Sequence, residues 1–218
     1  MVLRWSGDMN TFISVEYSEL FLFEDPFAKQ WLRLEPISKW VMVDDIDRKL
    51  AYGQWQPSEP VVFRGYMGSL VADILWTGLP PLLCVSERVV TILKENKFTG
   101  WSTYPVEVYD RKGNGLTGFY GFAITSYAGK RDLTRSTKIK KSPYVPGGSI
   151  PELYKGFYFN KTEWDGSDIF RVHPSIKIVK RVVKNVFMKE RIRNVKFIAL
   201  PDEETDTIIY SKFEEKQK

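Results

Sequence analysis

Two stretches of this chain share one pattern, in which an amphipathic helix is followed by a turn and a strand. The helices are predicted over 86–96 and 175–190; each begins at a serine that can cap its first turn, and each ends in Lys-Glu. An apolar-x-(Gly or Asn)-apolar segment follows each one, at Phe98–Trp101 and Ile192–Val195. Gly and Asn enter the left-handed backbone region most easily, so both segments favour a helix-to-strand turn. The pattern predicts two copies of one helix–turn–strand unit, with chance likeness of two helix ends as the alternative.

Strand-like segments surround the two predicted helices, with a hairpin turn at Lys112–Gly115. These segments lie at 11–25, 40–43, 61–63, 73–76, 104–109, 116–127, 156–159 and 194–200. A basic and polar segment, 128–151, is predicted to be a long loop. We therefore expect an α+β fold, with a mixed or mostly antiparallel sheet and two main packed helices.

The length of 218 residues and the hydrophobic share of 43% allow one domain with its own core. Folding a chain of this size removes roughly 70% of its unfolded surface from water, so the fold needs no metal or disulfide. We expect a single domain over 1–218. Within it, 1–80 is a β-rich N-terminal part and 82–201 is a core that contains both units.

The chain has a single cysteine, Cys84, which lies in an apolar run. This predicts a buried thiol and excludes a disulfide within one chain. The first residues show no apolar stretch of signal-peptide length, and no segment approaches the roughly 20 apolar residues of a membrane span. We therefore expect a cytoplasmic protein without a membrane partner.

Residue types that catalysis or metal binding requires are sparse. His173 is the only histidine, nothing marks it as the base of a triad, and a structural zinc site needs four Cys or His ligands. The Gly113–Gly118 segment matches the Gly-x-Gly-x-x-Gly dinucleotide fingerprint by letter, but strand-like residues follow it where a helix is required. Asp44, Asp45 and Asp47 could bind a hard cation, but we interpret them as acidic residues that end a strand. The sequence predicts no catalytic residue, no metal and no cofactor.

The net charge of +5 is unevenly distributed along the chain. Residues 1–60 contain six Lys or Arg and ten Asp or Glu, whereas 171–196 contain nine basic residues and one acid. The helix over 175–191 would present a basic face made of Lys177, Lys180, Arg181, Lys184 and Arg191. Such a face is typical of contact with phosphates or an acidic protein, and more often of a solvated helix surface. A nucleic-acid-binding module is therefore the first alternative function, although nucleic acid is not the expected partner.

The segment Trp164–Phe170 combines a turn with anchoring apolar residues. Asp165-Gly166 favours a turn, and Ser167 and Asp168 can accept hydrogen bonds from loose backbone N–H groups. This structural role accounts for the segment without any activity. An enzyme with a carboxylate site near Asp165 and Asp168 is the second alternative function.

Several segments recur in a fixed order: Phe98-Thr99-Gly100-Trp101, Tyr104-Pro105-Val106, Gly129-Lys130-Arg131-Asp132, Arg135-Ser136, Gly156-Phe157-Tyr158-Phe159 and Trp164-Asp165-Gly166-Ser167-Asp168. In this order they resemble a bacterial family, once described as a domain of unknown function, of immunity proteins from polymorphic toxin systems. The resemblance covers about Leu82 to Pro201. It implies a cytosolic protein that binds and neutralises a cognate toxin encoded next to it, and it implies no catalytic residues.

Contact residues do not follow from this resemblance, because immunity contacts are specific to each toxin pair. Candidate contact regions are the acidic N-terminal segment, the 128–151 loop and the basic helix. Aromatic and charged side chains near turns are typical of protein interfaces. On that basis the candidate partner-binding residues are Trp101, Tyr104, Arg131, Asp132, Trp164, Asp165, Asp168, Lys180, Arg181 and Lys184.

Overall fold

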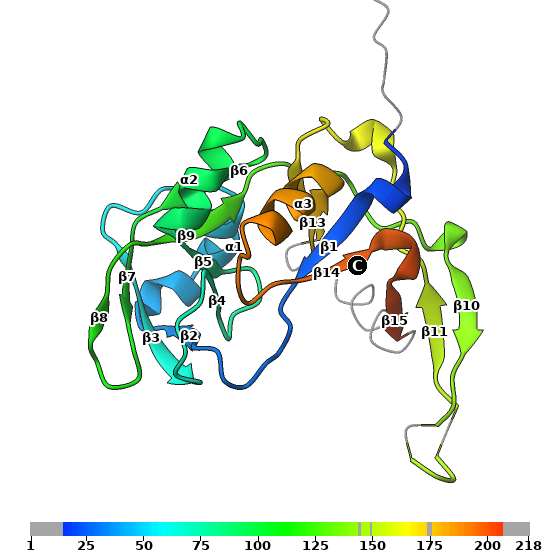
Figure 1. Ribbon diagram of the computed structural model, residues 1–218, viewed down its shortest axis with the longest axis horizontal. Coiled ribbons are helices and arrows are strands. Elements are labelled where there is room, and N and C mark those ends of the chain that lie inside the picture. The colour runs from blue at the N-terminus through cyan, green and yellow to red at the C-terminus, as the bar shows by residue number, and fades with distance from the viewer. Residues whose placement is uncertain (1–14, 144, 149, 174–175, 207–218) are drawn as a thin grey trace, which may run out of the picture.

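The computed structural model describes residues 15–143, 145–148, 150–173 and 176–206 (Figure 1). Within these residues the fold is α+β, with three α-helices and four small sheets. Two of the helices, α2 and α3, lie side by side above the strands in Figure 1, and one small sheet extends from the body at the right.

One sheet is built around the helix–turn–strand unit in the middle of the chain. Its strand order is β4-β5-β9-β6, and all three pairs are antiparallel. Its elements are β4 (Ile74–Trp76), β5 (Leu83–Ser86), α2 (Glu87–Glu95), β6 (Trp101–Tyr104) and β9 (Phe119–Ile124). Ser86 caps α2, because its hydroxyl accepts a hydrogen bond from the Val89 N–H. The prediction of a helix over about 86–96 is confirmed.

A second sheet repeats this arrangement around the later unit. Its strand order is β12-β13-β1-β14, again fully antiparallel. Its elements are β12 (Ile169–His173), β13 (Ile176–Lys180), α3 (Arg181–Lys189), β14 (Lys196–Ala199) and β1 (Leu20–Glu24). Strand β1 comes from the N-terminal part of the chain and occupies the central place that β9 has in the first sheet.

From β5 and β13 to the helix exits, corresponding residues of the two units lie 94 positions apart, whereas β4 and β12 correspond at an offset of 95. Strands β5 and β13 pair with β9 and β1 in the same register. After the helices, Lys97 and Arg191 have φ of 54° and 52°, and Gly100 and Asn194 have φ of 88° and 66°. The two helix exits therefore follow the same backbone path. The Lys-Glu pairs at the helix ends, Lys94-Glu95 and Lys189-Glu190, lie 95 positions apart and so do not occupy corresponding positions.

The two units share one apolar core. Both sheets and both helices contribute buried side chains to it, including Phe23, Val85, Val89, Phe122, Ile169, Val179, Val183 and Phe187. Each such side chain contributes about 1.5–3 kcal/mol by leaving water. A helix of nine residues is marginal alone, so this shared core is what stabilises α2 and α3.

A third sheet flanks the first unit, with strand order β2-β3-β7-β8. Its strands are β2 (Arg33–Pro36), β3 (Val61–Met67), β7 (Val106–Tyr109) and β8 (Gly115–Leu116). Strands β3 and β7 are parallel. The short helix α1 (Ile46–Ala51) packs beside it, and buried Leu34, Phe63, Leu75 and Tyr104 belong to a second core there.

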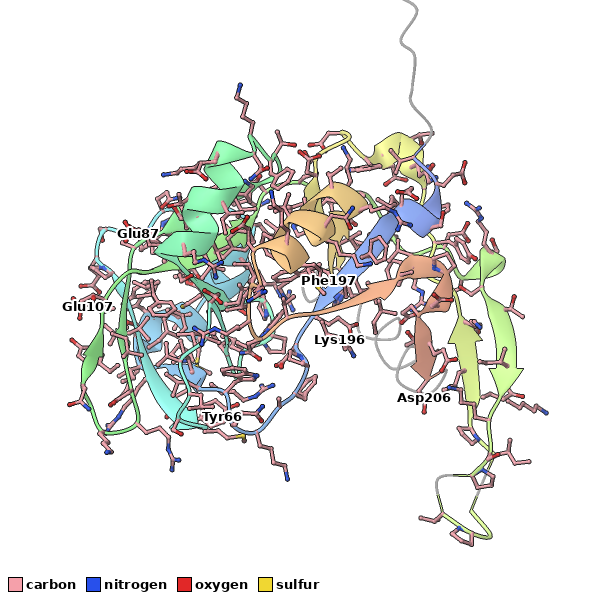
Figure 2. All side chains as sticks on the ribbon, in the orientation of Figure 1. Tyr66, Glu87, Glu107, Lys196, Phe197 and Asp206 are labelled. Carbon is pink, nitrogen blue, oxygen red and sulfur yellow. The ribbon has the colours of Figure 1, made fainter. Side chains whose placement is uncertain are left out.

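The sheet at the right of Figure 1 has the order β10-β11-β15. Its strands are β10 (Thr137–Lys140), β11 (Glu152–Lys155) and β15 (Glu204–Asp206). Asp206 of β15 and Glu107 of β7 lie at opposite ends of the molecule in Figure 2. Single 3-10 turns connect the larger elements, at Tyr17–Glu19, Lys39–Met42, Leu133–Arg135, Lys161–Glu163 and Leu200–Asp202.

The predicted helix over 175–190 is wrong in its first part. Residues 176–180 form strand β13, and α3 begins only at Arg181. The alternating β-branched residues of Ile176-Lys177-Ile178-Val179 fit a strand, and burial on the shared core decides between the two possibilities. Ser175, the expected cap, lies outside the described residues, and Lys180 takes the cap position without a side-chain hydrogen bond.

Other strand boundaries also differ from the sequence predictions. The 40–43 segment is a 3-10 turn, 156–159 is not a strand, and 128–151 contains strand β10. Pro105 separates β6 from β7, since it has no N–H to continue a ladder. The predicted last strand over 194–200 is followed by one more, β15, which pairs with β11. Among the described residues, no helix is both long and apolar enough to span a membrane.

Candidate functional site

The two segments that carry the most specific part of the resemblance meet in space. We call the contact of the Thr99–Trp101 and Trp164–Asp168 turns the turn junction. The Thr99 N–H and hydroxyl both donate to Asp168 Oδ2, at 3.0 Å each. The Ile169 N–H donates to the Thr99 carbonyl oxygen at 3.1 Å. Residues about 69 positions apart in sequence thus form one hydrogen-bonded unit.

Gly100 allows the two turns to approach each other. Its φ of +88° lies in the left-handed region, where a side chain adds strain. A Cβ at this position would lie only 1.9 Å from the Ile169 carbonyl oxygen and 2.8 Å from Ser167 Cβ. In the second unit, Asn194 replaces Gly100, and its side-chain amide donates to the Ile74 carbonyl oxygen at 2.8 Å.

Lys180 closes the turn junction from the side of β13. Its Nζ donates to the Gly166 carbonyl oxygen at 2.5 Å and to Asp168 Oδ1 at 3.1 Å. The same ammonium lies 5.3 Å from the centre of the Trp164 ring, which in turn packs on Phe170 at 4.6 Å. The structure therefore brings together four of the predicted site residues: Trp164, Asp165, Asp168 and Lys180.

The carboxylate of Asp168 has a counterpart in the first unit, which is that of Asp73. Asp168 lies directly before β12, and Asp73 lies directly before β4. Asp73 Oδ2 accepts a hydrogen bond from the Arg193 N–H at 2.9 Å. Arg193 is the residue that corresponds to Thr99. Each unit therefore supplies one carboxylate that binds the helix exit of the other unit. This reciprocal exchange gives Asp168 a structural role.

Asp165 is held by its own turn. Its Oδ1 accepts from the Ser126 hydroxyl at 2.7 Å and from the Ser167 N–H at 2.9 Å. Burial by itself raises the pKa of Asp165, but the hydrogen bonds from Ser167 and Ser126 outweigh this effect and lower it. The group is ionised at neutral pH and already bound, which does not favour a general acid at this position.

We expect Asp168→Ala to lower the free energy of unfolding by about 2 kcal/mol, because it removes a charged acceptor from Thr99 and Lys180. Urea unfolding of the purified variant measures the loss. Lys196→Ala is a suitable control, because it removes an ion pair with Glu24 whose members are largely exposed. An Asp168→Ala variant with wild-type stability and a lost enzymatic activity would contradict the structural role.

A fifth candidate, Trp101, belongs to the turn junction, but its ring packs on the shared core, and the other aromatic and charged candidates lie outside the junction. Trp101 stacks on Phe122, with ring centres 5.9 Å apart, and Tyr104 is buried in the core beside the third sheet. The Arg131 side chain is only 2% exposed and pairs with Glu203. Asp132 caps a 3-10 turn by accepting from the Thr134 N–H. Tyr104 and Arg131 therefore do not offer their side chains to a partner.

The predicted basic helix face is not continuous. Lys177 and Lys180 lie on β13, and Lys177 is buried, with its Nζ donating to the Pro80 carbonyl oxygen at 3.0 Å. Arg181 Nε donates to Glu19 at 2.5 Å, and the Lys184 ammonium lies over the Phe21 ring. Of the five basic residues, three are thus engaged with polar groups of the protein itself.

Sites for a metal or a reacting group are not visible in the part of the chain that the structure describes. No three His, Cys, Asp or Glu side chains there are placed to hold a metal ion. A cavity in the shared core is lined by apolar side chains alone.

Two titratable side chains are shifted by burial. Burial raises the pKa of Cys84 far above its usual value, so its thiol is protonated at neutral pH. Burial, followed by the charge of Arg48, lowers the pKa of His173.

An exposed apolar patch lies where two loops adjoin, and the sequence reasoning missed it. We use the name apolar patch for five exposed apolar side chains on these loops and on the adjoining end of β3: Phe27, Tyr66, Met67, Leu70 and Val71. Backbone hydrogen bonds hold the loops together, since the Leu70 N–H donates to Gln30 and the Leu70 carbonyl oxygen accepts from Leu32. Tyr66 is labelled in Figure 2 and lies at the lower edge of the view. The sequence feature that could have indicated these residues is the apolar run on both sides of Gly68-Ser69, which does not show the alternation of apolar and polar residues expected of a strand.

Comparisons with known proteins identify no relative of this chain, so any proposal about its function depends on the structural features described above. No protein-family model matches the chain, and no curated protein matches it.

Proposed function

We propose that this protein binds another protein and acts as a cytoplasmic immunity factor that neutralises a cognate toxin. The apolar patch is the observation that supports this proposal. Leu70 and Phe27 are 52% and 76% exposed on segments whose backbones are hydrogen-bonded to each other, and exposed large apolar side chains on neighbouring segments are typical of protein interfaces. The order of the Thr-Gly-Trp and Trp-Asp-Gly-Ser-Asp segments, which resembles the immunity family, supports a toxin as the partner.

Charged side chains adjoin the apolar patch. Lys29 is exposed nearby in the chain, whereas Arg33, 4.8 Å from the centre of the Phe27 ring, is buried and paired with Asp25 beneath that ring. An apolar centre with a charged rim is the usual anatomy of a stable interface. The two alternatives receive less support, because three of the five basic residues and the Asp165 and Asp168 carboxylates are bound within the protein.

Co-expression with the product of the adjacent gene tests the proposed function. We expect that product to stop bacterial growth when expressed alone, and we expect this protein to restore growth and to co-purify with it in a fixed ratio. A neighbouring product that is harmless alone, or one that remains toxic and does not co-purify, would count against an immunity function.

Leu70→Asp should weaken the complex at least tenfold and abolish growth protection, because it replaces an exposed apolar side chain of the apolar patch with a charge. Calorimetric titration of the toxin measures the affinity. Met188→Asp is the matched control, since Met188 is an apolar residue of α3 that is 62% exposed and lies outside the patch. Equal affinities for the two variants would show that the partner binds elsewhere.

A further inference from the structure

Arg171 of β12 has an unusual environment for a partly buried arginine. Its guanidinium carbon lies 3.6 Å from the centre of the Tyr52 ring and 4.8 Å from that of Tyr127, so the group is stacked between two tyrosines. Its Nε is buried and has no hydrogen-bond partner among the described residues. A buried polar group is normally satisfied, so this one needs an explanation.

No acidic side chain of the described residues neutralises Arg171. Burial lowers the pKa of Arg171, and the only titratable groups that oppose this are Tyr52 and Tyr127, which are uncharged at neutral pH. Buried or partly buried arginines are normally paired with a carboxylate. Asp45 and Asp47 lie on the neighbouring α1 segment, but Asp45 pairs with Arg48 at 3.4 Å, and neither acts on Arg171.

The repeated architecture does not require an arginine at this position. Arg171 occupies the place that Trp76 has in the first unit, because Trp76 pairs with Leu83 and Arg171 with the corresponding Lys177. The Trp76 indole N–H donates to the Asn194 carbonyl oxygen at 2.8 Å. Arg171 has no such acceptor in the described structure, which sets it apart from a packing residue.

The protein holds the stacked group in place from both sides. Gly53 follows α1, and a Cβ there would lie 2.7 Å from Thr125 Cγ2, so its absence brings the end of α1 and Tyr52 against the β9 segment. On the other side, the Arg171 N–H donates to Ser126 and its carbonyl oxygen accepts from Ala128. These two bonds fix Tyr127, which is 42% exposed, beside the guanidinium.

Further positive charge lies close to this group. Arg48 acts on Tyr52 and on His173 of the same strand as Arg171, although Asp47 acts on Tyr52 with the opposite sign and Arg48 itself pairs with Asp45. We propose that Tyr52, Tyr127 and Arg171 form an oxyanion-binding site, which takes a carboxylate or a phosphate group. The rings fix the plane of the guanidinium, and its two terminal Nη groups, not the enclosed Nε, donate to two oxygens of the ligand. This site would exist whether or not the protein neutralises a toxin.

Nuclear magnetic resonance titrations with sodium acetate and with inorganic phosphate, at constant ionic strength, test this site. We expect saturable shifts of the Tyr52 and Tyr127 backbone amides with at least one of the two anions. A response to acetate alone identifies a carboxylate ligand, and a response to phosphate alone a phosphate ligand. The absence of saturation with both anions would overturn the proposal.

Arg171→Gln should abolish the saturable response, and Arg171→Lys should weaken it at least fivefold, because an ammonium lacks the planar fork. Arg64→Gln is the matched control, since Arg64 is an exposed arginine of β3. Circular dichroism verifies that each variant is folded, and Arg171→Lys keeps the test valid if Arg171→Gln is not. An unchanged response in the folded Arg171 variants would also overturn the proposal.

Discussion

Gly100→Ala should be among the most destabilising single substitutions in this protein, with a loss of about 3–5 kcal/mol in the free energy of unfolding. Two effects combine. The φ of +88° is strained for any residue with a Cβ, and the new methyl group would lie 1.9 Å from the Ile169 carbonyl oxygen. That oxygen belongs to a strand of the other unit, so it can move only if the turn junction opens.

Gly113→Ala separates the two effects. Gly113 has nearly the same φ, +89°, but no heavy atom lies within 4 Å of the position of its Cβ. This variant should lose only the free energy that corresponds to the strain of a positive φ, about 1–2 kcal/mol. Urea unfolding of both variants measures the difference, which reports the close approach of the two turns. Equal losses would mean that the turns are not in contact in solution.

Arg131→Met should cost about 3–5 kcal/mol, because it leaves a buried carboxylate without its counter-charge. Arg131 donates to Glu203 at 2.8 Å, to Thr205 at 2.9 Å and to the Gly156 carbonyl oxygen at 3.1 Å. These bonds connect the ends of β11 and β15 to the body, so their loss should loosen the β10-β11-β15 sheet first. Hydrogen exchange of the β11 amides measures that local effect.

The loss of unfolding free energy caused by Arg131→Met, here called the deficit, should depend on pH in a defined direction. Burial raises the pKa of Glu203, and Arg131 is the main group that lowers it, so the variant raises that pKa further. A folded-state pKa above the unfolded one means that the folded state binds more protons, and stability falls as pH rises through that range. The deficit should therefore be smaller at acidic than at neutral pH.

Two further variants check that assignment. Arg131→Met with Glu203→Leu should be more stable than Arg131→Met alone, because no uncompensated charge remains. Lys140→Met is a surface control, since Lys140 and Glu152 lie 3.5 Å apart with largely exposed side chains. It should leave stability within experimental error. A pH-independent deficit in Arg131→Met would contradict the role of Glu203.

Local chemistry was sufficient to predict the first helix and both helix exits. Ser86 has a side-chain oxygen that can cap a helix, and Gly100 and Asn194 are residues that tolerate positive φ. The buried Cys84 was predictable from its apolar run. The hairpin after β7 lies where it was predicted, but its positive φ is at Gly113 and not at the Asn114-Gly115 pair on which the prediction rested.

Segments with mixed signals could not be assigned without the tertiary structure. Residues 176–180 read as part of an amphipathic helix, and pairing with β1 and β12 on the shared core made them a strand. The candidate site shows the same limit. Sequence placed Arg131 and Tyr104 among possible contacts, whereas long-range packing buries both.

The sequence alone determined the α+β class, the capped first helix and the two glycine- or asparagine-containing turns, because propensity and turn chemistry operate within a few neighbouring residues. Only the tertiary structure decided that each unit binds the other's helix exit through Asp73 and Asp168, and that Arg171 lies between two tyrosines. Such contacts join residues tens of positions apart, and their energies depend on burial and geometry that no local pattern encodes.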